Sequence, residues 1–194
     1  MDTDTELFLA VKKGDDQAFS RLFQKYFPKI LNLIYRFVSD PQHAEDIAQE
    51  VFVRVYSGAK TFSPQSKFST WLYKVTINRC FSDYKKTRRE KERQVTESDL
   101  ATDGQRDPLT LENHPSPQPS PEAQVINTEL QQSIQSALDK LPPDQKMALV
   151  LLTYEGLSYE EIARISGSSI KAVERRIYHA RQTLRTLLAD HISP

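Results

Sequence analysis

Two blocks of this 194-residue sequence carry apolar residues at helical spacing, and a proline-rich stretch without that spacing separates them. Leu22, Tyr26 and Ile30 are typical of the first block, since each follows the last by four residues. Such a repeat predicts α-helices, because it places the apolar side chains on one helix face. Five of the eleven prolines lie between residues 94 and 121. We therefore predict an all-α protein of two small helical domains joined by an extended linker.

The predicted domains span residues 1–93 and 122–194, with the linker at residues 94–121. The linker carries five acidic residues and one arginine, so its net charge of −4 should keep it extended and solvated. Pro28 falls inside a predicted helix, which must therefore be kinked or split at that point. The expected helices lie near residues 4–13, 15–38, 42–57, 66–92, 123–140, 143–155, 159–166 and 169–189.

Composition excludes several classes of protein. The 26 basic and 26 acidic residues cancel, so the overall charge does not indicate a polyanionic partner. Cys80 is the single cysteine and cannot form an internal disulfide or a cysteine-based zinc site; a small apolar core residue is its simplest interpretation. Four scattered histidines and the lack of a glycine-rich phosphate loop predict that the chain is not an enzyme and holds no cofactor or metal.

Targeting and membrane signals are also missing from the sequence. The first ten residues include acidic but no basic side chains, unlike a signal peptide. The longest apolar run, Met147 to Leu152, is too short to span a bilayer. We therefore expect a soluble, cytoplasmic protein with no membrane partner.

The segment from residue 158 to residue 184 has the layout of a helix-turn-helix. Ser158 and Glu161 should form a capping box, the first helix should end at Gly167, and Ser168 should cap the second helix. Apolar residues at steps of four and three predict a buried stripe on that second helix. The stripe consists of Val173, Ile177, Ala180, Leu184 and Leu187.

The second helix carries five basic residues and one glutamate, and Lys171 and Arg175 lie on the face opposite the stripe. A basic helix that follows a tight turn suits insertion into the major groove of DNA. An ordinary amphipathic helix with a solvated basic face is the alternative. The candidate DNA contacts are Ser169, Lys171, Glu174, Arg175, Arg176, Tyr178, His179 and Arg181.

The helix expected near residues 66–92 combines aromatic residues with a basic tail. Single-stranded DNA needs this combination, because bases stack on rings while phosphates pair with lysine and arginine. One helical face carries a candidate track of Trp71, Lys74, Asn78, Lys85 and Arg89. The alternative is a core role for the aromatic and aliphatic residues, which we favour for Phe68 and Leu72 and leave open for Trp71.

On the helix expected near residues 42–57, Asp46, Gln49, Glu50 and Val53 follow one another at helical spacing. The three polar residues therefore share one strip of the surface. Without further context, a solvated helix face is the simplest interpretation.

Three sequence blocks, in this order, resemble the sigma-70 family and specifically its extracytoplasmic-function (ECF) group. They are EDIAQEVFVRVY, FSTWLYKVTINRCFSDYKKTRR and LPPDQKMALVLLTYEGLSYEEIARISGSSIKAVERRIYHARQTLR. The resemblance covers about residues 6–92 and 122–188. It implies that the first domain (region 2) binds RNA polymerase core at the clamp coiled coil and opens the minus-10 element. It also implies that the second domain (region 4) binds the minus-35 element and the polymerase flap.

The resemblance implies roles for individual residues. Asp46, Gln49, Glu50 and Val53 become a polymerase-docking surface. A pocket for a flipped minus-10 base would involve Phe62, Ser66, Lys67 and Phe68. The helix beside the melted strand would present Trp71, Lys74, Asn78, Asp83, Lys85, Arg88 and Arg89. The basic face of the second helix-turn-helix helix would read the minus-35 element.

Two features depart from the pattern of the resembling family. Glu174 occupies a position that is usually basic or small, and its carboxylate can accept a hydrogen bond from a cytosine amino group, whereas an arginine would read guanine. The linker is long and acidic, and we expect negative charge to suit a polymerase channel that later holds RNA. An anti-sigma factor commonly sequesters such proteins and is expected here as a further partner. A stand-alone helix-turn-helix transcriptional regulator is the alternative function.

Overall fold

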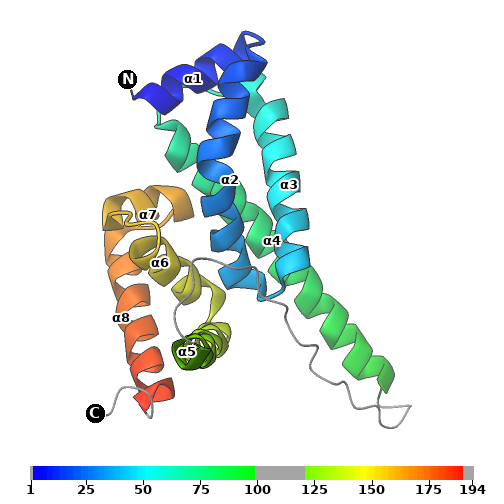
Figure 1. Ribbon diagram of the computed structural model, residues 1–194, viewed down its shortest axis with the longest axis vertical. Coiled ribbons are helices and arrows are strands. Elements are labelled where there is room, and N and C mark those ends of the chain that lie inside the picture. The colour runs from blue at the N-terminus through cyan, green and yellow to red at the C-terminus, as the bar shows by residue number, and fades with distance from the viewer. Residues whose placement is uncertain (1, 99–120, 190–194) are drawn as a thin grey trace.

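The computed structural model describes residues 2–98 and 121–189. All regular structure within these two ranges is helical, and the helices form two groups that lie side by side (Figure 1). The predicted all-α fold is therefore confirmed. None of the described helices is both long and apolar enough to cross a bilayer. Most of the predicted linker, and with it most of the linker's acidic residues, lies outside the described residues.

The first group contains four α-helices and a 3-10 turn. These are α1 (Thr3–Lys12), α2 (Asp16–Val38), α3 (Pro41–Gly58), η1 (Ala59–Thr61) and α4 (Phe68–Ser98). Asp2, Asp15 and Asp40 cap α1, α2 and α3, because each side chain accepts a hydrogen bond from a first-turn amide. The α2 helix continues through Pro28 to Val38, with Ser39 as its C-cap, so of the two predicted alternatives, a kink or a split, the split is wrong.

The second group contains α5 (Pro121–Asp139), α6 (Pro143–Thr153), α7 (Tyr159–Ser166) and α8 (Ile170–Leu187). The capping box at Ser158 is confirmed, and Gly167 ends α7 with φ 64°, in the left-handed region. The predicted cap at Ser168 is wrong. Ser169 caps α8 instead, because its hydroxyl accepts from the Ala172 amide at 3.2 Å.

The predicted apolar stripe on α8 is only partly buried. Val173, Ile177 and Ala180 are buried against the neighbouring helices, and Leu184 is half-buried. Leu187 remains 37% exposed, which contradicts the prediction. The reason is a surface hollow between α5 and the end of α8, which Leu187 lines.

Polar contacts join the two groups where α6 and its flanking residues meet the end of α2. The Arg36 guanidinium lies 3.4 Å from the centroid of the Tyr154 ring. Ser39 donates to Asp139 at 2.7 Å, and the Tyr73 hydroxyl of α4 donates to Glu155. Buried apolar residues of both groups also belong to one continuous cluster. The helix-turn-helix is thus packed against the first domain in this structure.

Candidate functional site

The predicted strip on α3 lies at the surface. Asp46, Gln49, Glu50 and Val53 are all exposed, and together with Arg54 they line a shallow hollow of about 610 Å³. Val53 is a large apolar residue that is 66% exposed. Because carboxylates surround an accessible apolar side chain, the strip can dock a protein helix that offers both basic and apolar groups.

A network of charged residues fixes one end of this strip. Arg79 of α4 donates from Nε to Glu50 at 2.7 Å and from a terminal nitrogen to Asp83 at 3.2 Å. The other carboxylate oxygen of Asp83 lies 2.9 Å from His43 Nε2. The hydrogen bond from Arg79 lowers the pKa of Glu50, which keeps this carboxylate charged at neutral pH.

The network corrects one residue that the family resemblance implied. Asp83 was expected beside the melted strand, but it is 7% exposed and is held by Arg79 and His43. Its carboxylate is therefore turned into the protein. Sequence reasoning missed Arg79 and His43 altogether. The spacing of four residues between Arg79 and Asp83 was the available signal, because such pairs meet on a helix surface.

The loop before α4, residues 62–67, carries the predicted base pocket. Ser66 and Lys67 are exposed, as residues that receive a flipped base must be. Phe68 and Leu72 are fully buried, which confirms the core role favoured for both. Phe62 is 3% exposed, so it too lies in the core and not, as the resemblance implied, at the surface of a pocket. The rings of Phe62 and Phe68 pack against Phe8 of α1, with centroids 5.0 and 4.6 Å away. They form the apolar floor beneath the loop.

Trp71 belongs mainly to the same aromatic cluster. Its ring lies 5.2 Å from that of Phe8 and 5.5 Å from that of Phe62, and the side chain is only partly exposed. A Cβ atom at Gly58 would come within 3.3 Å of the indole, so the glycine allows the end of α3 to approach it closely. These contacts favour the core role over stacking on a base.

The exposed face of α4 carries the remaining candidates of the track. Lys74 and Asn78 lie along the middle of the helix and are exposed, and the basic residues further along are exposed as well. These are Lys85, Arg88 and Arg89. A row of accessible cations beside an exposed loop can bind the phosphates of a nucleic acid strand.

Most of the predicted DNA contacts on α8 are accessible. The exposed residues are Ser169, Lys171, Glu174, Arg175, Tyr178, His179 and Arg181. Tyr178 is 61% exposed, and its ring meets that of His179 edge to face. This face presents cations, a carboxylate and an aromatic hydroxyl, which are groups that can meet base edges in a major groove.

Arg176 differs from its neighbours on α8. Its guanidinium donates to Ser168 at 3.0 Å and to Asp144 of α6 at 3.1 Å. This placement differs from the predicted DNA contact, because the side chain ties α8 to the helix behind it. The spacing on α8 could not show this, since Asp144 lies 32 residues earlier in the chain.

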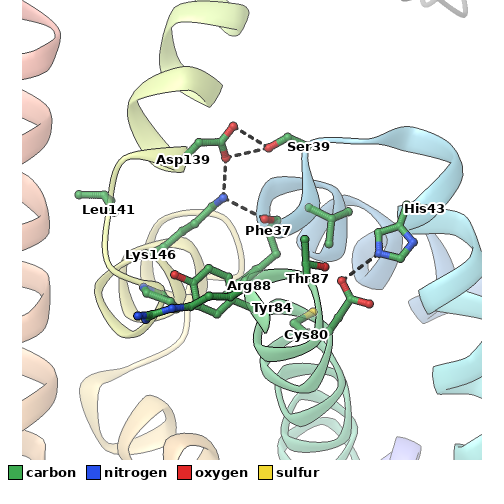
Figure 2. Close-up of a pocket in the computed structure, with 13 residues that line it drawn as sticks. Phe37, Ser39, His43, Cys80, Tyr84, Thr87, Arg88, Asp139, Leu141 and Lys146 are labelled. Carbon is green, nitrogen blue, oxygen red and sulfur yellow. Dashed lines mark hydrogen bonds and ion pairs between the residues drawn. The ribbon is translucent and has the colours of Figure 1, made fainter. Parts of the chain in front are cut away.

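A cavity of about 690 Å³ lies where the two helical groups meet (Figure 2). Lys146 reaches the cavity wall and donates to Asp139 at 2.7 Å and to the Phe37 carbonyl at 3.1 Å. Burial lowers the pKa of Lys146 and raises the pKa of Cys80 to about 12, so the Cys80 thiol stays protonated and unreactive. The described residues include no group of three or more side chains that could hold a metal ion.

Both helical groups match known protein families. A model of sigma-70 region 2 matches residues 22–90, and a model of sigma-70 region 4 matches residues 131–184. The RNA polymerase sigma-H factor of Pseudomonas aeruginosa is 36% identical and aligns with 93% of this chain and 91% of its own. The ECF RNA polymerase sigma factor SigW of Bacillus subtilis is 35% identical over 93% of this chain and 94% of its own.

A solved structure shares the fold over nearly the whole chain. The structure of CnrH in complex with the cytosolic domain of CnrY covers 99% of this chain and 100% of the matched chain, with a TM-score of 0.71 and 24% identity. The chain belongs to the sigma-70 family. Within that family it is an ECF sigma factor.

Its function follows from this membership. Sigma regions 2 and 4 bind RNA polymerase and promoter DNA, and the chain carries both regions. The alternative of a stand-alone helix-turn-helix regulator is not favoured, because it leaves region 2 without a purpose. Sigma factors are not enzymes, and the polymerase carries out the chemistry of transcription.

Proposed function

We propose that residues 1–93 bind polymerase and the minus-10 element, that residues 122–194 bind the minus-35 element, and that residues 94–121 link the two. The observation that carries this proposal is the position of three exposed surfaces on three different helices. The polymerase surface is the α3 strip of Asp46, Gln49, Glu50 and Val53, and the clamp coiled coil is its partner. Arg79 supports the proposal, because it holds Glu50 in place and charged.

The minus-10 surface in this proposal consists of the exposed loop residues and the cations of α4. Ser66 and Lys67 line the site of the flipped base, while Phe62, Phe68 and Trp71 support the loop from below. Extruding a base costs a few kcal/mol, so a loop that is already ordered favours strand opening. Along the melted strand, phosphates would contact Lys74, Asn78, Lys85, Arg88 and Arg89.

The minus-35 surface in this proposal is the exposed face of α8. Lys171, Glu174 and Arg175 lie in the half of the helix that enters a major groove first. We assign a cytosine amino group to Glu174 and a guanine edge to Arg175. Ser169 and Arg181 flank them and would contact phosphates, while Tyr178 and His179 lie along the same face.

The same proposal includes regulation by an anti-sigma factor. It also includes binding of region 4 to the polymerase flap and a cytoplasmic location for the chain. Two solved structures with this fold are complexes with a partner protein, and one of these partners is named as an anti-sigma factor. One holds CnrH with the cytosolic domain of CnrY, and the other holds the sigma factor RpoE with the anti-sigma factor NepR from Bartonella quintana. The second has a TM-score of 0.64 and 24% identity, so it supports the fold and leaves the partner to experiment.

A gel-shift experiment tests the proposal against the regulator alternative. Duplex DNA that carries both promoter elements is mixed with the chain, with bacterial core polymerase, or with both. We expect a specific shift only when both proteins are present. The minus-10 bases of the shifted DNA should then be unpaired. A specific shift by the chain alone, unchanged by core polymerase, would support the stand-alone regulator instead.

A further inference from the structure

Helix α1 lies outside the residues that match sigma-70 region 2, since the match begins at residue 22. It nevertheless contacts the loop that precedes α4. Thr5, Phe8 and Lys12 follow each other at steps of three and four, so they share one face of α1. Each of the three touches the 62–67 loop or its flanking residue Phe68, as the following contacts show.

Thr5 holds the C-terminal end of the loop. It is 1% exposed, and its hydroxyl accepts from the Phe68 amide at 2.9 Å while donating to Asp2 at 2.7 Å. The Phe68 amide belongs to the first turn of α4, where amides lack a partner within their own helix. Thr5 therefore supplies this partner from 63 residues earlier in the chain.

Lys12 holds the N-terminal end of the loop. Its ammonium donates to the Phe62 carbonyl at 3.0 Å, directly after η1 ends. A hydrogen bond from a charged donor is stronger than one between neutral groups, and it fixes the direction of this carbonyl. Between Thr5 and Lys12, the buried Phe8 ring packs on both Phe62 and Phe68.

We propose that α1 is a positioning element for the minus-10 loop, with Thr5 and Lys12 as the positioning residues that anchor its two ends. The inference rests on the proposed function, in which Ser66 and Lys67 of this loop receive the flipped base. Both anchors act through the loop backbone, and buried Thr5 cannot touch DNA. A loop held at both ends loses less conformational freedom when it captures a base, so the anchors strengthen that capture.

Four variants test the anchors. Lys12→Met removes the ammonium and keeps an unbranched side chain, and Lys13→Met is its control at the next exposed lysine. Thr5→Val removes the hydroxyl at constant shape, and Thr5→Ser restores it. The probe is the fluorescent non-template minus-10 strand of a promoter selected with the wild-type chain. Its affinity is measured for holoenzyme reconstituted from core polymerase and the full chain.

We expect Lys12→Met and Thr5→Val to weaken binding of this strand by about five- to tenfold. Lys13→Met and Thr5→Ser should stay within about twofold of the wild-type chain. Affinity for core polymerase and for duplex minus-35 DNA should not change in any variant, because those surfaces lie on α3 and α8. The salt dependence of strand binding should also keep its slope, because neither anchor contacts a phosphate.

Three results would overturn the inference. The first is equal strand affinity for Lys12→Met and Lys13→Met. The second is a loss confined to Lys12→Met with a salt slope reduced by about one, which would make Lys12 a phosphate contact. The third is a parallel loss of core affinity and melting temperature, which would give α1 only a structural role. If wild-type holoenzyme does not bind the strand at all, the proposed function itself fails.

Discussion

At the scale of single residues, Arg175 and Lys85 should contact DNA in different ways. Arg175 lies on the exposed face of α8 and is assigned to a base edge, whereas Lys85 lies on the exposed face of α4 and is assigned to a phosphate. Arg175→Ala should therefore cost about 1 to 3 kcal/mol of binding at particular minus-35 bases and relax selectivity there. Transcription from a panel of promoters with single minus-35 substitutions measures this directly.

Lys85→Ala is the matched comparison. It should weaken all promoters alike and flatten the dependence of binding on salt, because a phosphate contact carries no sequence information. Equal losses from both variants on every promoter would remove the reading role of Arg175. Arg176→Ala should show neither of these two patterns of promoter loss, since its guanidinium is bonded to Ser168 and Asp144.

At the scale of elements, the turn between α7 and α8 depends on Gly167. Its φ of 64° is a conformation that L side chains adopt only with strain, and no atom lies within 4 Å of where its Cβ would be. Gly167→Ala should therefore lower the free energy of unfolding by about 1 kcal/mol through backbone strain alone. Urea denaturation of the full chain, followed by circular dichroism, measures this loss.

Gly167→Asn separates backbone strain from side-chain clash at the same position. Asparagine tolerates the left-handed region better than alanine does, so this variant should lose less stability than Gly167→Ala. If Gly167→Asn lost more stability than Gly167→Ala, a clash of the larger side chain, rather than the backbone φ, would determine the loss.

The helices and the helix-turn-helix were predictable because their signals are local. Apolar spacing and the Ser158 capping box locate a helix from a few neighbouring residues in the sequence. A shift of one residue, from Ser168 to Ser169, could not be predicted, because both serines can cap and the choice depends on how Ser168 bonds to Arg176. The α2 helix likewise continues through Pro28, because tertiary packing outweighs the local penalty of one missing hydrogen bond.

The candidate site was less predictable, because its geometry depends on distant contacts. Spacing places Phe62 and Phe68 near the loop correctly, but only the packing of Phe8 against them shows that their rings are buried. The family resemblance places Asp83 beside DNA, but its ion pair with Arg79 and its contact with His43 turn it inward. No pattern within α1 indicates that Lys12 meets a carbonyl 50 residues away.

At the scale of the whole molecule, the proposed function requires the packed arrangement to open during initiation. The names of the two promoter elements place them about 25 base pairs apart, which is about 85 Å along a duplex. In the structure, the Lys67 ammonium of the 62–67 loop lies 3.9 Å from a carboxylate oxygen of Glu161 in α7. In the proposed function these two neighbouring groups bind elements about 85 Å apart, so we expect them to separate on the promoter.

A reversible crosslink tests this requirement. Arg36→Cys and Tyr154→Cys replace residues that contact each other across the two groups and lie outside every proposed binding surface. Native Cys80 can stay, because it is buried and unreactive. Joined by a short cleavable bismaleimide, the chain should lose at least about tenfold in promoter opening and regain it after cleavage. Full activity of the crosslinked chain would show that opening is not needed.

The central claim is that this chain gives core polymerase its promoter specificity and opens DNA only together with it. Transcription of a randomised promoter library by bacterial core polymerase, with sequencing of the transcript starts, tests this most directly. The predicted result is a shared pair of upstream elements about 25 base pairs apart that appears only when the chain is added and is accompanied by permanganate-reactive minus-10 thymines. Transcript starts that are the same with and without the chain would contradict it.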